Sequence, residues 1–475
     1  MTESLLKLYG FSANIRKTLK REVINVKVIK FGGSSVASAE QLKKVLAIVT
    51  ADNSRRFVVV SAPGKRNNKD KKVTDLLIQF YNAVLYKQPA EEVIRKIVSR
   101  YTEIATEFQV EESIEKPFYA ELKALQENFD ETDPYALDSF LASGENLNAQ
   151  LIAACFQKSG VNARYINPKE LGILVSNEPQ NARILEKSYE KMYQWRDSEE
   201  ILIIPGFFGY TEDGHVCTFS RGGSDITGSI VAAGMQVDLY ENFTDVDGIY
   251  AASPKYIHEP ELIEYATYRE IRELTYAGFT VFHDEALMPS YKAKIPVIIK
   301  NTNNPECQGT LIQKSFENKS RNEVVGVASD DGFCGITVGK YLLNREVGIV
   351  RRILQILEDL HIGFEHMPSG IDDISIILRE RQLTRDTEAA LMKRIEEEIQ
   401  PDHLSIEHGL SVVALVGEGM RERPGTTSDS TAALARKNVN LRMISQGADE
   451  RSIIFTIRSE QERLAVRSLY YTFFD

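Results

Sequence analysis

VINVKVIKFGGSS, residues 23–35, is the stretch that decides the fold. Within it, Ile24, Val26 and Val28 alternate with polar residues, as they do in a β-strand that has one apolar face. The strand is predicted to end at Lys30, after which two glycines and two serines form a loop. A helical pattern of apolar residues follows the loop. This order of strand, glycine loop and helix is typical of the first unit of an α/β sheet.

The same alternation of strand and helix continues to about residue 310. Between residues 75 and 128 the chain is charged and mostly helical, so a helical excursion from the sheet is expected. Further strands are predicted at residues 57–61, near Tyr165, and at residues 201–204, 237–240 and 297–299. Strands that alternate with helices indicate an α/β fold with a mainly parallel sheet between helices.

An internal repeat begins after about residue 324. Residues 360–377 (LHIGFEHMPSGIDDISII) correspond without a gap to residues 437–454 (KNVNLRMISQGADERSII), and Gly370 coincides with Gly447. Each copy has an amphipathic helix, a strand, a Gly/Asp turn that suits a hairpin, and a second strand. A further helix is predicted after each copy, at residues 384–400 and 461–471. Two copies of a βαββαβ unit of the ferredoxin-like kind are therefore expected.

Composition excludes several classes of function. The chain has 475 residues, of which 43% are apolar and 26% are charged, and its net charge is −11. An acidic chain is a poor match for a phosphate backbone, so no nucleic-acid partner is expected. No apolar run approaches the ~20 residues that span a bilayer, so no membrane association is expected. The four cysteines form no CxxC pair, and neither a disulfide framework nor a structural metal site is predicted.

Two glycine loops carry the chemistry that the sequence predicts. In the first, Lys30 precedes Gly32 and Gly33. Glycines let backbone N–H groups approach an anion closely, and the lysine adds a positive charge. Because the lysine precedes the glycines, the loop is not a Walker A loop. The alternative is a plain glycine turn with a lysine that reaches solvent.

The second glycine loop is FSRGGSDIT, residues 219–227, between a strand and a helix. Arg221 offers a planar fork of donors to a carboxylate or a phosphate. Ser224 is predicted to be the N-cap of a helix at residues 225–235, and helix N-termini attract anions. Two such loops, each with one cation, favour phosphoryl transfer over a purely structural role.

Two further clusters give weaker signals. Residues 243–250 (FTDVDGIY) form a turn after a strand, with two carboxylates and a tyrosine, and Lys255 follows them. The alternative for this cluster is a tight Asp-Gly turn without function. In residues 141–146 (LASGEN), Glu145 is predicted to open a helix, and the alternative is that it only caps that helix.

The four clusters in this order, together with the paired repeat, resemble the aspartate kinases of the amino-acid kinase superfamily. The resemblance covers the chain from about Val26 onward, and it is to the monofunctional, lysine-sensitive branch of Gram-positive bacteria. It implies an amino-acid kinase fold followed by two ferredoxin-like ACT domains. The implied divisions are an N-terminal extension at residues 1–22, a catalytic domain at 23–320, and ACT domains at 325–408 and 409–475.

The resemblance also implies a function. It implies a cytoplasmic enzyme that uses ATP and Mg²⁺ to phosphorylate the side-chain carboxylate of L-aspartate. The product, 4-phospho-L-aspartate, begins the lysine, threonine and methionine branch of amino-acid biosynthesis. Control by an end-product amino acid is implied, and so is a homodimer or a larger homo-oligomer. Kinases of glutamate or N-acetylglutamate share the nucleotide motifs and are alternatives, as is a catalytically silent amino-acid sensor.

Residue roles follow from the resemblance only at matching positions. Lys30 would contact the transferring phosphoryl group, and Asp225 would organise the site around it. Glu145 would hold the amino group of aspartate and Arg221 its α-carboxylate, while Thr74 would lie beside the substrate. The residues implied at the nucleotide are Lys30, Phe31, Gly32, Gly33, Ser61, Gly223, Ser224, Thr244, Asp245, Tyr250 and Lys255. No side chain is implied as a metal ligand.

An amino-acid pocket is implied in the first repeat. Backbone groups at the start of its first helix would take the carboxylate of the effector, and Glu365 on the next strand would take its cation. The implied residues are Glu346, Val347, Gly348, Glu365, Ser369 and Asp372. Lysine is the expected effector and threonine is its competitor. The alternative is that these residues only cap and turn the fold.

Three departures from the family pattern bear on the catalytic site. Lys255 stands where many relatives have arginine, so bidentate contact with a phosphate is in doubt. Residues 276–285 replace a segment that in many relatives carries a lysine aimed at the nucleotide, and this chain has no obvious counterpart. The loop at residues 64–72 is long and basic, and the sequence does not indicate its role.

Overall fold

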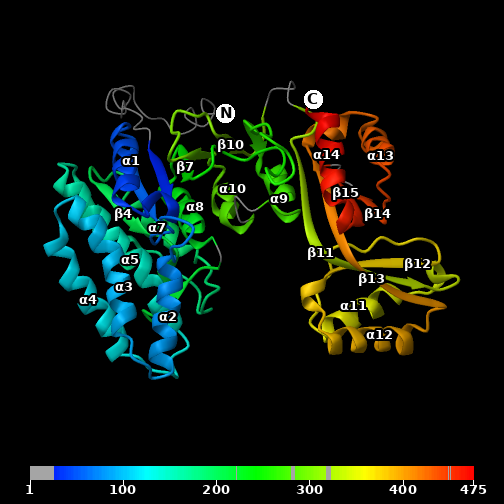
Figure 1. Cartoon of the computed structure of the whole chain (residues 1–475), viewed down its shortest axis with the longest axis horizontal. Coiled ribbons are helices and arrows are strands. Elements are labelled where there is room, and N and C mark those ends of the chain that lie inside the picture. The colour runs from blue at the N-terminus through cyan, green and yellow to red at the C-terminus, as the bar shows by residue number, and fades with distance from the viewer. Residues whose placement is uncertain (1–25, 221, 280–283, 317–321, 448, 450) are drawn as a thin grey trace, which may run out of the picture. The chain divides into compact units, whose positions relative to one another are not determined.

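The computed structural model describes residues 26–220, 222–279, 284–316, 322–447, 449 and 451–475. The N-terminal extension predicted at residues 1–22 lies outside the described residues. The chain divides into two compact units (Figure 1). Unit 1 consists of Met1–Asp247 and Glu285–Gln308, and unit 2 consists of Gly248–Asp284 and Gly309–Asp475.

The core of unit 1 is a parallel sheet. Its strands lie in the order β3-β4-β2-β1-β7-β9, and neighbouring strands are parallel. Val58, Val59 and Val60 are fully buried, as expected for a parallel strand that is covered on both faces. The bounds are β1 Lys27–Phe31, β2 Arg55–Val60, β3 Ala163–Tyr165, β4 Ile201–Pro205, β7 Leu239–Thr244 and β9 Val297–Asn301. The predicted parallel sheet is confirmed, although β1 runs one residue beyond the predicted end at Lys30.

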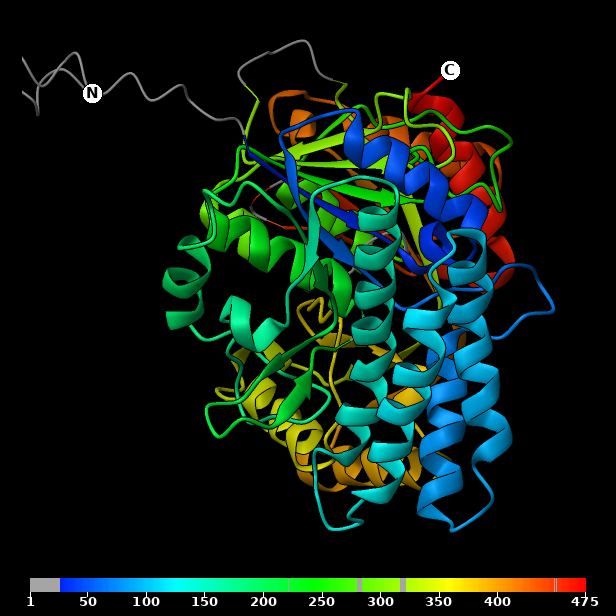
Figure 2. The same cartoon turned by 90° about the vertical axis from the view of Figure 1, so that its left-hand side faces the viewer.

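Helices pack against this sheet and against one another. α5 packs on β2, β3 and β4, whereas α8 packs on β1, β2 and β7. Figure 2 shows α2, α3, α4 and α5 side by side, and the first three confirm the helical excursion predicted at residues 75–128. The bounds are α1 Ala39–Thr50, α2 Val73–Leu85, α3 Glu91–Glu107, α4 Glu111–Glu127, α5 Ala136–Lys158, α6 Pro168–Leu171, α7 Lys187–Tyr193, α8 Gly223–Met235 and α10 Met288–Ala293. A short antiparallel hairpin, β5 Phe208–Tyr210 and β6 Val216–Thr218, precedes α8.

Unit 2 is built on an antiparallel sheet. Its strands lie in the order β12-β11-β13-β15-β14. Their bounds are β11 Gly326–Gly339, β12 Asp373–Arg379, β13 His403–Val416, β14 Met443–Gln446 and β15 Ser452–Arg458. The helices of these repeats are α11 Ile349–Asp359, α12 Arg385–Ile399, α13 Thr426–Arg436 and α14 Glu462–Phe473. The helices predicted at residues 384–400 and 461–471 are thus confirmed as α12 and α14.

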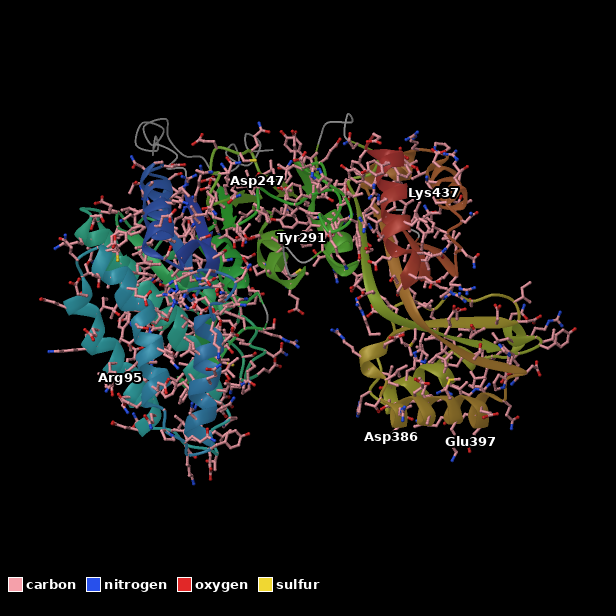
Figure 3. The ribbon with its side chains drawn as sticks, viewed as in Figure 1. Arg95, Asp247, Tyr291, Asp386, Glu397 and Lys437 are labelled. Carbon is pink, nitrogen blue, oxygen red and sulfur yellow. The ribbon has the colours of Figure 1, made fainter. Side chains whose placement is uncertain are left out.

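The helix α12 shows how the repeats bury their cores. Leu391, Ile395 and Ile399 recur at a spacing of four residues and are buried. Asp386 and Glu397 are exposed and lie on the outer side of the helix (Figure 3). This amphipathic pattern holds α12 against the sheet through one face and leaves the other to solvent.

The two repeats are interleaved by the long strands β11 and β13. These strands are each 14 residues long and pair from Gly326↔Val416 to Gly339↔His403. β12 pairs only with the second half of β11, and β15 pairs only with the second half of β13. The strand that would follow α14 in a plain βαββαβ unit is therefore supplied by the first half of β11. The expected boundary between residues 408 and 409 falls inside β13.

The hairpin expected in the first copy is only partly formed. In place of a strand before the turn, the chain makes two isolated bridges, His366↔Ile377 and Ser369↔Ile374. In the second copy, β14 and β15 form the expected antiparallel pair. The first-copy prediction of a full strand is therefore wrong, because only two residues before the turn reach ladder geometry.

The segment at residues 248–284 packs within unit 2. Val327 in β11 donates its N–H to the carbonyl of Ala251 at 2.7 Å. β8 Tyr265–Thr267 pairs in parallel with β10 Thr310–Gln313, and α9 Tyr268–Tyr276 follows β8. The division at residue 320 that the sequence suggests therefore differs from the division into compact units.

From composition, we expected no membrane-spanning helix, no disulfide framework and no structural metal site. Among the residues that the structure describes, no helix is both long enough and apolar enough to cross a membrane. All four cysteines are free, and three of them are buried. Within the same residues, no group of three or more His, Cys, Asp and Glu side chains is arranged to hold a metal ion.

Candidate active site

The centre of the site in unit 1 is an ion pair between Lys30 and Asp225. Lys30 is the next-to-last residue of β1 and is only 5% exposed. Its Nζ lies 2.5 Å from Oδ1 of Asp225, which is in the first turn of α8. An ammonium held in this way at the carboxyl end of a parallel strand is positioned for an anionic ligand, because ligands of open α/β sheets bind at that edge.

The start of α8 is shaped by glycines. Gly222 is the N-cap, with a φ of 77°, so the predicted cap at Ser224 is wrong. Ser224 lies one residue inside the helix and packs against Gly206, where an added Cβ would be 2.7 Å from the serine hydroxyl. A Cβ on Gly223 would be 2.5 Å from the ring of Phe207. Larger residues would push the helix terminus, and Asp225 with it, away from Lys30.

The first glycine loop lies against a second glycine. The N–H of Gly64 donates to the carbonyl of Gly33 at 2.8 Å. A Cβ added to Gly33 would lie 2.9 Å from the carbonyl oxygen of Ala62, so the backbone approach requires glycine there. A Cβ on Gly32 would lie 3.6 Å from Nζ of Lys30. Gly32 therefore leaves the space beside the ammonium open.

Glu145 is a buried carboxylate beside this centre. It lies in the middle of α5, so the prediction that it opens a helix is wrong. Its Oε2 has no hydrogen-bond partner, and the residue is 5% exposed. Burial raises the pKa of Glu145 to about 7, against the lowering effect of hydrogen bonds from the Ala62 N–H and the Ser224 hydroxyl and of the charge of Lys30. Such a carboxylate attracts a cationic group of a ligand.

Three polar residues of the site were missed by sequence reasoning. Asn242 in β7 donates from Nδ2 to Oδ1 of Asp225 at 2.7 Å. Asn148, three residues after Glu145, donates to the carbonyl of Ser61 at 2.6 Å. Both are fully or almost fully buried. A buried amide inside an apolar strand or helix was the signal that was available, because such groups need partners.

The third missed residue is Arg100 in α3. Its guanidinium donates to the carbonyl of Gly64 at 2.7 Å and to that of Lys71 at 2.6 Å. It also lies 3.2 Å from Asp70. The long basic loop is thus tied at both ends to a buried arginine, which holds the start of α2 and the half-buried Thr74 in place.

The comparisons with known proteins identify the family of the chain. A model of the amino acid kinase family matches residues 25–301, which is more than half of the chain, and an ACT domain model matches residues 413–473. Aspartokinase 3 of Bacillus subtilis is 51% identical over 449 residues, which cover 94% of this chain and 99% of that protein. The chain belongs to the aspartokinases.

Solved structures resemble this aspartokinase over nearly its whole length. The aspartate kinase of Clostridium acetobutylicum has a TM-score of 0.84 at 38% identity, and the match covers 94% of this chain and 100% of that one. Aspartokinase III of E. coli, in complex with aspartate and ADP, has a TM-score of 0.76 at 23% identity, and the match covers 95% and 100% of the two chains. The second likeness concerns the fold alone.

The residues expected at the nucleotide of this aspartokinase are divided between the units. In unit 1, Thr244 ends β7, and its hydroxyl donates to the exposed Asp245 at 3.2 Å. Tyr250 and Lys255 belong to unit 2, where Nζ of Lys255 lies 4.9 Å from the centre of the Tyr256 ring. Arg221, expected at the substrate, lies outside the described residues.

Two other expected nucleotide residues, Phe31 and Ser61, lie at the carboxyl ends of β1 and β2. The side chain of Phe31 is fully buried and packs on Phe243, with 5.3 Å between the ring centres. Ser61 follows β2 and donates its N–H to the carbonyl of Phe31 at 3.2 Å. Residues 280–283, in the segment where many relatives carry a lysine, lie outside the described residues.

The expected effector residues of the aspartokinase form two groups in the first repeat. Gly348, with a φ of 83°, is the N-cap of α11, and Val347 beside it is 99% exposed. Glu346 pairs with Lys340 at 2.7 Å and with Arg352, and these contacts lower its pKa. Lys340 also donates its N–H to the carbonyl of Asp372 at 2.7 Å.

The second group surrounds Glu365. Nε of Arg379 lies 3.2 Å from its Oε1, and the hydroxyl of Tyr276 donates to its Oε2. Ser369 makes only a backbone bridge to Ile374. Glu346 has two cationic partners and Glu365 has one, so of the two carboxylates Glu365 is the better suited to accept a further cation.

Proposed function

We propose that this aspartokinase transfers the γ-phosphoryl group of ATP to the side-chain carboxylate of L-aspartate. The observation that carries the proposal is the buried cluster of Lys30, Asp225 and Glu145. Lys30 supplies a positive charge for the phosphoryl group, and the unpartnered oxygen of Glu145 is suited to the ammonium group of an amino acid. ADP and 4-phospho-L-aspartate are the products.

The reaction needs no general base. A side-chain carboxylate has an ordinary pKa near ~4, so at neutral pH aspartate is already a nucleophile. The obstacle is the repulsion between this carboxylate and the phosphates, which positioning and positive charge overcome. Lys30 and the N–H groups of the two glycine loops are the groups available in unit 1. Asn242 holds Asp225, and Asp225 in turn holds Lys30.

The donor set fits Mg²⁺ that arrives on the nucleotide. Mg²⁺ is usually bound by one or two carboxylates together with substrate phosphates and water, not by a cage of protein ligands. The described residues contain no cluster of three or more potential metal ligands, and Asp245 is an exposed carboxylate just after β7. Asp245 would hold the ion, whose charge would neutralise the phosphates during transfer.

The test is ATP-dependent formation of acyl phosphate, trapped as the hydroxamate with hydroxylamine. L-aspartate, L-glutamate and N-acetyl-L-glutamate are compared with the full chain. We expect turnover with aspartate that exceeds turnover with the other two by at least about 100-fold, because a carboxylate aligned in a fixed site tolerates a change of chain length poorly. Preferred turnover of glutamate or N-acetylglutamate would contradict L-aspartate as the substrate. No turnover with any of the three would favour a catalytically silent sensor.

Lysine is proposed as the effector that binds in the first repeat. Glu365 would take one ammonium group, and the N–H groups at the start of α11 would take the carboxylate. The exposed apolar residues Tyr341, Val347 and Ile371 in the same repeat favour a homodimer through this surface. Light scattering of the purified chain measures its mass and checks the dimer.

Replacing Glu365 with glutamine is expected to raise the lysine concentration for half-inhibition more than about tenfold, because a charge-assisted bond to the ammonium group is lost. Inhibition curves are measured relative to the uninhibited rate of each variant. Glu358→Gln, an exposed change on α11, is the matched control, and lysine should inhibit this variant as it inhibits the original chain. An unchanged curve for Glu365→Gln would remove Glu365 from the effector site. Inhibition by threonine and not by lysine would contradict the proposal that lysine is the effector.

A further inference from the structure

We propose that Asp138, in the first turn of α5, is a positioning residue for the amino-acid substrate. It fixes Thr218, the residue before the second glycine loop, to the helix that carries Glu145. The inference rests on the proposed function, in which Glu145 holds the ammonium group of aspartate. It gives Asp138 a part in the selection of aspartate over the longer glutamate.

Asp138 is a buried carboxylate whose hydrogen-bond donors are neutral groups. The residue is fully buried. Its Oδ1 accepts from the N–H of Thr218 at 2.6 Å, from the hydroxyl of Thr218 at 2.7 Å and from the N–H of Gln180 at 3.0 Å. Its Oδ2 accepts from the side-chain amide of Gln180. One carboxylate therefore joins α5 to the end of β6 and to the chain around Gln180.

A carboxylate is a costly group for joining these segments. An amide in the same place would also offer an oxygen to Thr218, at a lower desolvation cost. The hydrogen bonds of a carboxylate are about twice as strong as those between neutral groups, so they hold Thr218 more rigidly. Such rigidity favours a role in positioning, because a catalytic site must hold its groups within about 0.5 Å of the productive geometry.

Helix α5 holds the second glycine loop at a further point. The hydroxyl of Ser224, which lies within this loop, donates to Glu145. Glu145 follows Asp138 by two helical turns, so the two carboxylates lie on one face of α5, about 10 Å apart along its axis. The loop is therefore held by α5 both at Thr218, just before it, and at Ser224.

A chain of hydrogen bonds connects this anchor to the Lys30 centre. Phe219 donates its N–H to the carbonyl of Phe207 at 2.8 Å. The N–H of Phe207 donates to the hydroxyl of Thr227 at 2.9 Å. Thr227 follows Asp225 by two residues in α8, and Asp225 pairs with Lys30. The anchor therefore helps to fix the Lys30 centre relative to α5.

The separation between the Lys30 centre and Glu145 determines the length of the amino acid that fits. The ammonium group of the substrate binds at Glu145, and the reacting carboxylate must reach the phosphoryl group at Lys30. Glutamate is longer by one methylene, and one methylene in a fixed pocket changes kcat/KM by about 10–200-fold. Asp138 lies two turns away from Glu145, so its bonds to Thr218 keep their partners when the substrate binds.

The test is the ratio of kcat/KM for aspartate to kcat/KM for glutamate, measured with trapped acyl phosphate on the full chain. Thr218→Val removes the hydroxyl donor and keeps both the N–H bond and the shape of the side chain. Asp138→Asn keeps an oxygen for Thr218 and removes the charge. Each change is expected to lower the ratio about tenfold, because small displacements of reacting groups cost up to about 100-fold in rate. The double variant should lose less than the product of the two, because both changes act on one contact.

Gln180→Gly is the matched control. It removes the donor to the other oxygen of Asp138 and leaves both bonds from Thr218 in place. Gln180 has a φ of 58°, a conformation that glycine adopts readily, so the change adds no backbone strain. Its ratio should stay within about twofold of that of the original chain, because it does not act on the second glycine loop.

The outcomes separate this inference from the proposed function. If the original chain prefers aspartate and both Thr218→Val and Asp138→Asn keep its ratio, positioning by Asp138 is overturned, and a lower melting temperature alone would mark Asp138 as a structural residue. If Gln180→Gly lowers the ratio as much as Thr218→Val, the effect does not pass through Thr218 and the inference also fails. If the original chain prefers glutamate, the proposed function itself is wrong.

Discussion

Replacing Lys30 with methionine is expected to lower kcat about 10³-fold or more, because a positive charge placed at the transferring phosphoryl group is lost. Methionine retains most of the volume of the lysine stem, so the packing of β1 is largely preserved. The change leaves Asp225 with Asn242 as its remaining side-chain partner. The trapped acyl phosphate assay with saturating aspartate and ATP measures the effect.

Lys27→Met is the matched control on the same strand. Lys27 pairs with Asp52 at 2.8 Å in a partly exposed ion pair, and such pairs contribute about 0–1 kcal/mol. We expect its kcat to be unchanged. Activity of Lys30→Met within tenfold of the original chain, at an intact circular dichroism spectrum, would contradict a role for Lys30 in the transfer step.

Replacing Glu145 with glutamine is expected to lower kcat/KM for aspartate about 100-fold, because the ammonium group of the substrate loses its counter-charge. The same change is expected to stabilise the protein. A buried carboxylate that lacks a partner for one oxygen is costly when ionised, whereas the amide of the same shape is neutral. Activity and stability should therefore move in opposite directions, as at many functional sites.

The raised pKa of Glu145 determines how the stability of the protein changes with pH. The pKa of Glu145 is raised from 4.5 in the unfolded chain to about 7 in the folded one. Its destabilising effect is absent below pH 4.5, grows as the pH rises, and reaches about 3 kcal/mol above pH 7. Glu145→Gln should therefore melt several degrees higher at pH 8, with little difference at pH 4.5. Thermal unfolding at the two pH values measures this.

Kinetics provide a second readout of the same group. As the pH falls from 8 to 6, Glu145 gains a proton, so the KM for aspartate should rise in the original chain. The glutamine variant should lack this rise. Glu40→Gln on α1, whose side chain is 81% exposed, is the control and should behave like the original chain in both measurements. If Glu145→Gln is less stable than the original chain at pH 8, the ionised carboxylate of Glu145 has sufficient hydrogen-bond partners in the folded protein.

Much of the fold could be predicted because its signals are local. The valine-rich run at residues 57–60 forms a buried parallel strand, and the helix predicted after the first glycine loop is α1, with Ser38 as its N-cap. Lys30 was correctly placed near the end of its strand. Periodicity and turn chemistry act within a few residues, so they can be recognised without knowledge of the partner segments.

The errors arose where burial or pairing outweighs local signals. Ser143, Gly144 and Glu145 have the composition of a helix start, but α5 is buried over most of its length and continues through them. The predicted cap at Ser224 was wrong because the left-handed Gly222, two residues earlier, is the N-cap. Interleaving of the repeats could not be predicted, because local periodicity does not indicate with which strands the two halves of residues 326–339 pair.

The contact between Tyr256 and Glu462 joins residues that are 206 positions apart. At about 5–20 residues per second, a ribosome makes Tyr256 some ~10–40 s before Glu462. Throughout this interval the segment at residues 248–284 lacks α14, and during the first part of it the segment also lacks β11. A nascent chain therefore cannot complete unit 2 until the final helix emerges. Products of termination before Glu462 would carry Lys30 and lack this contact.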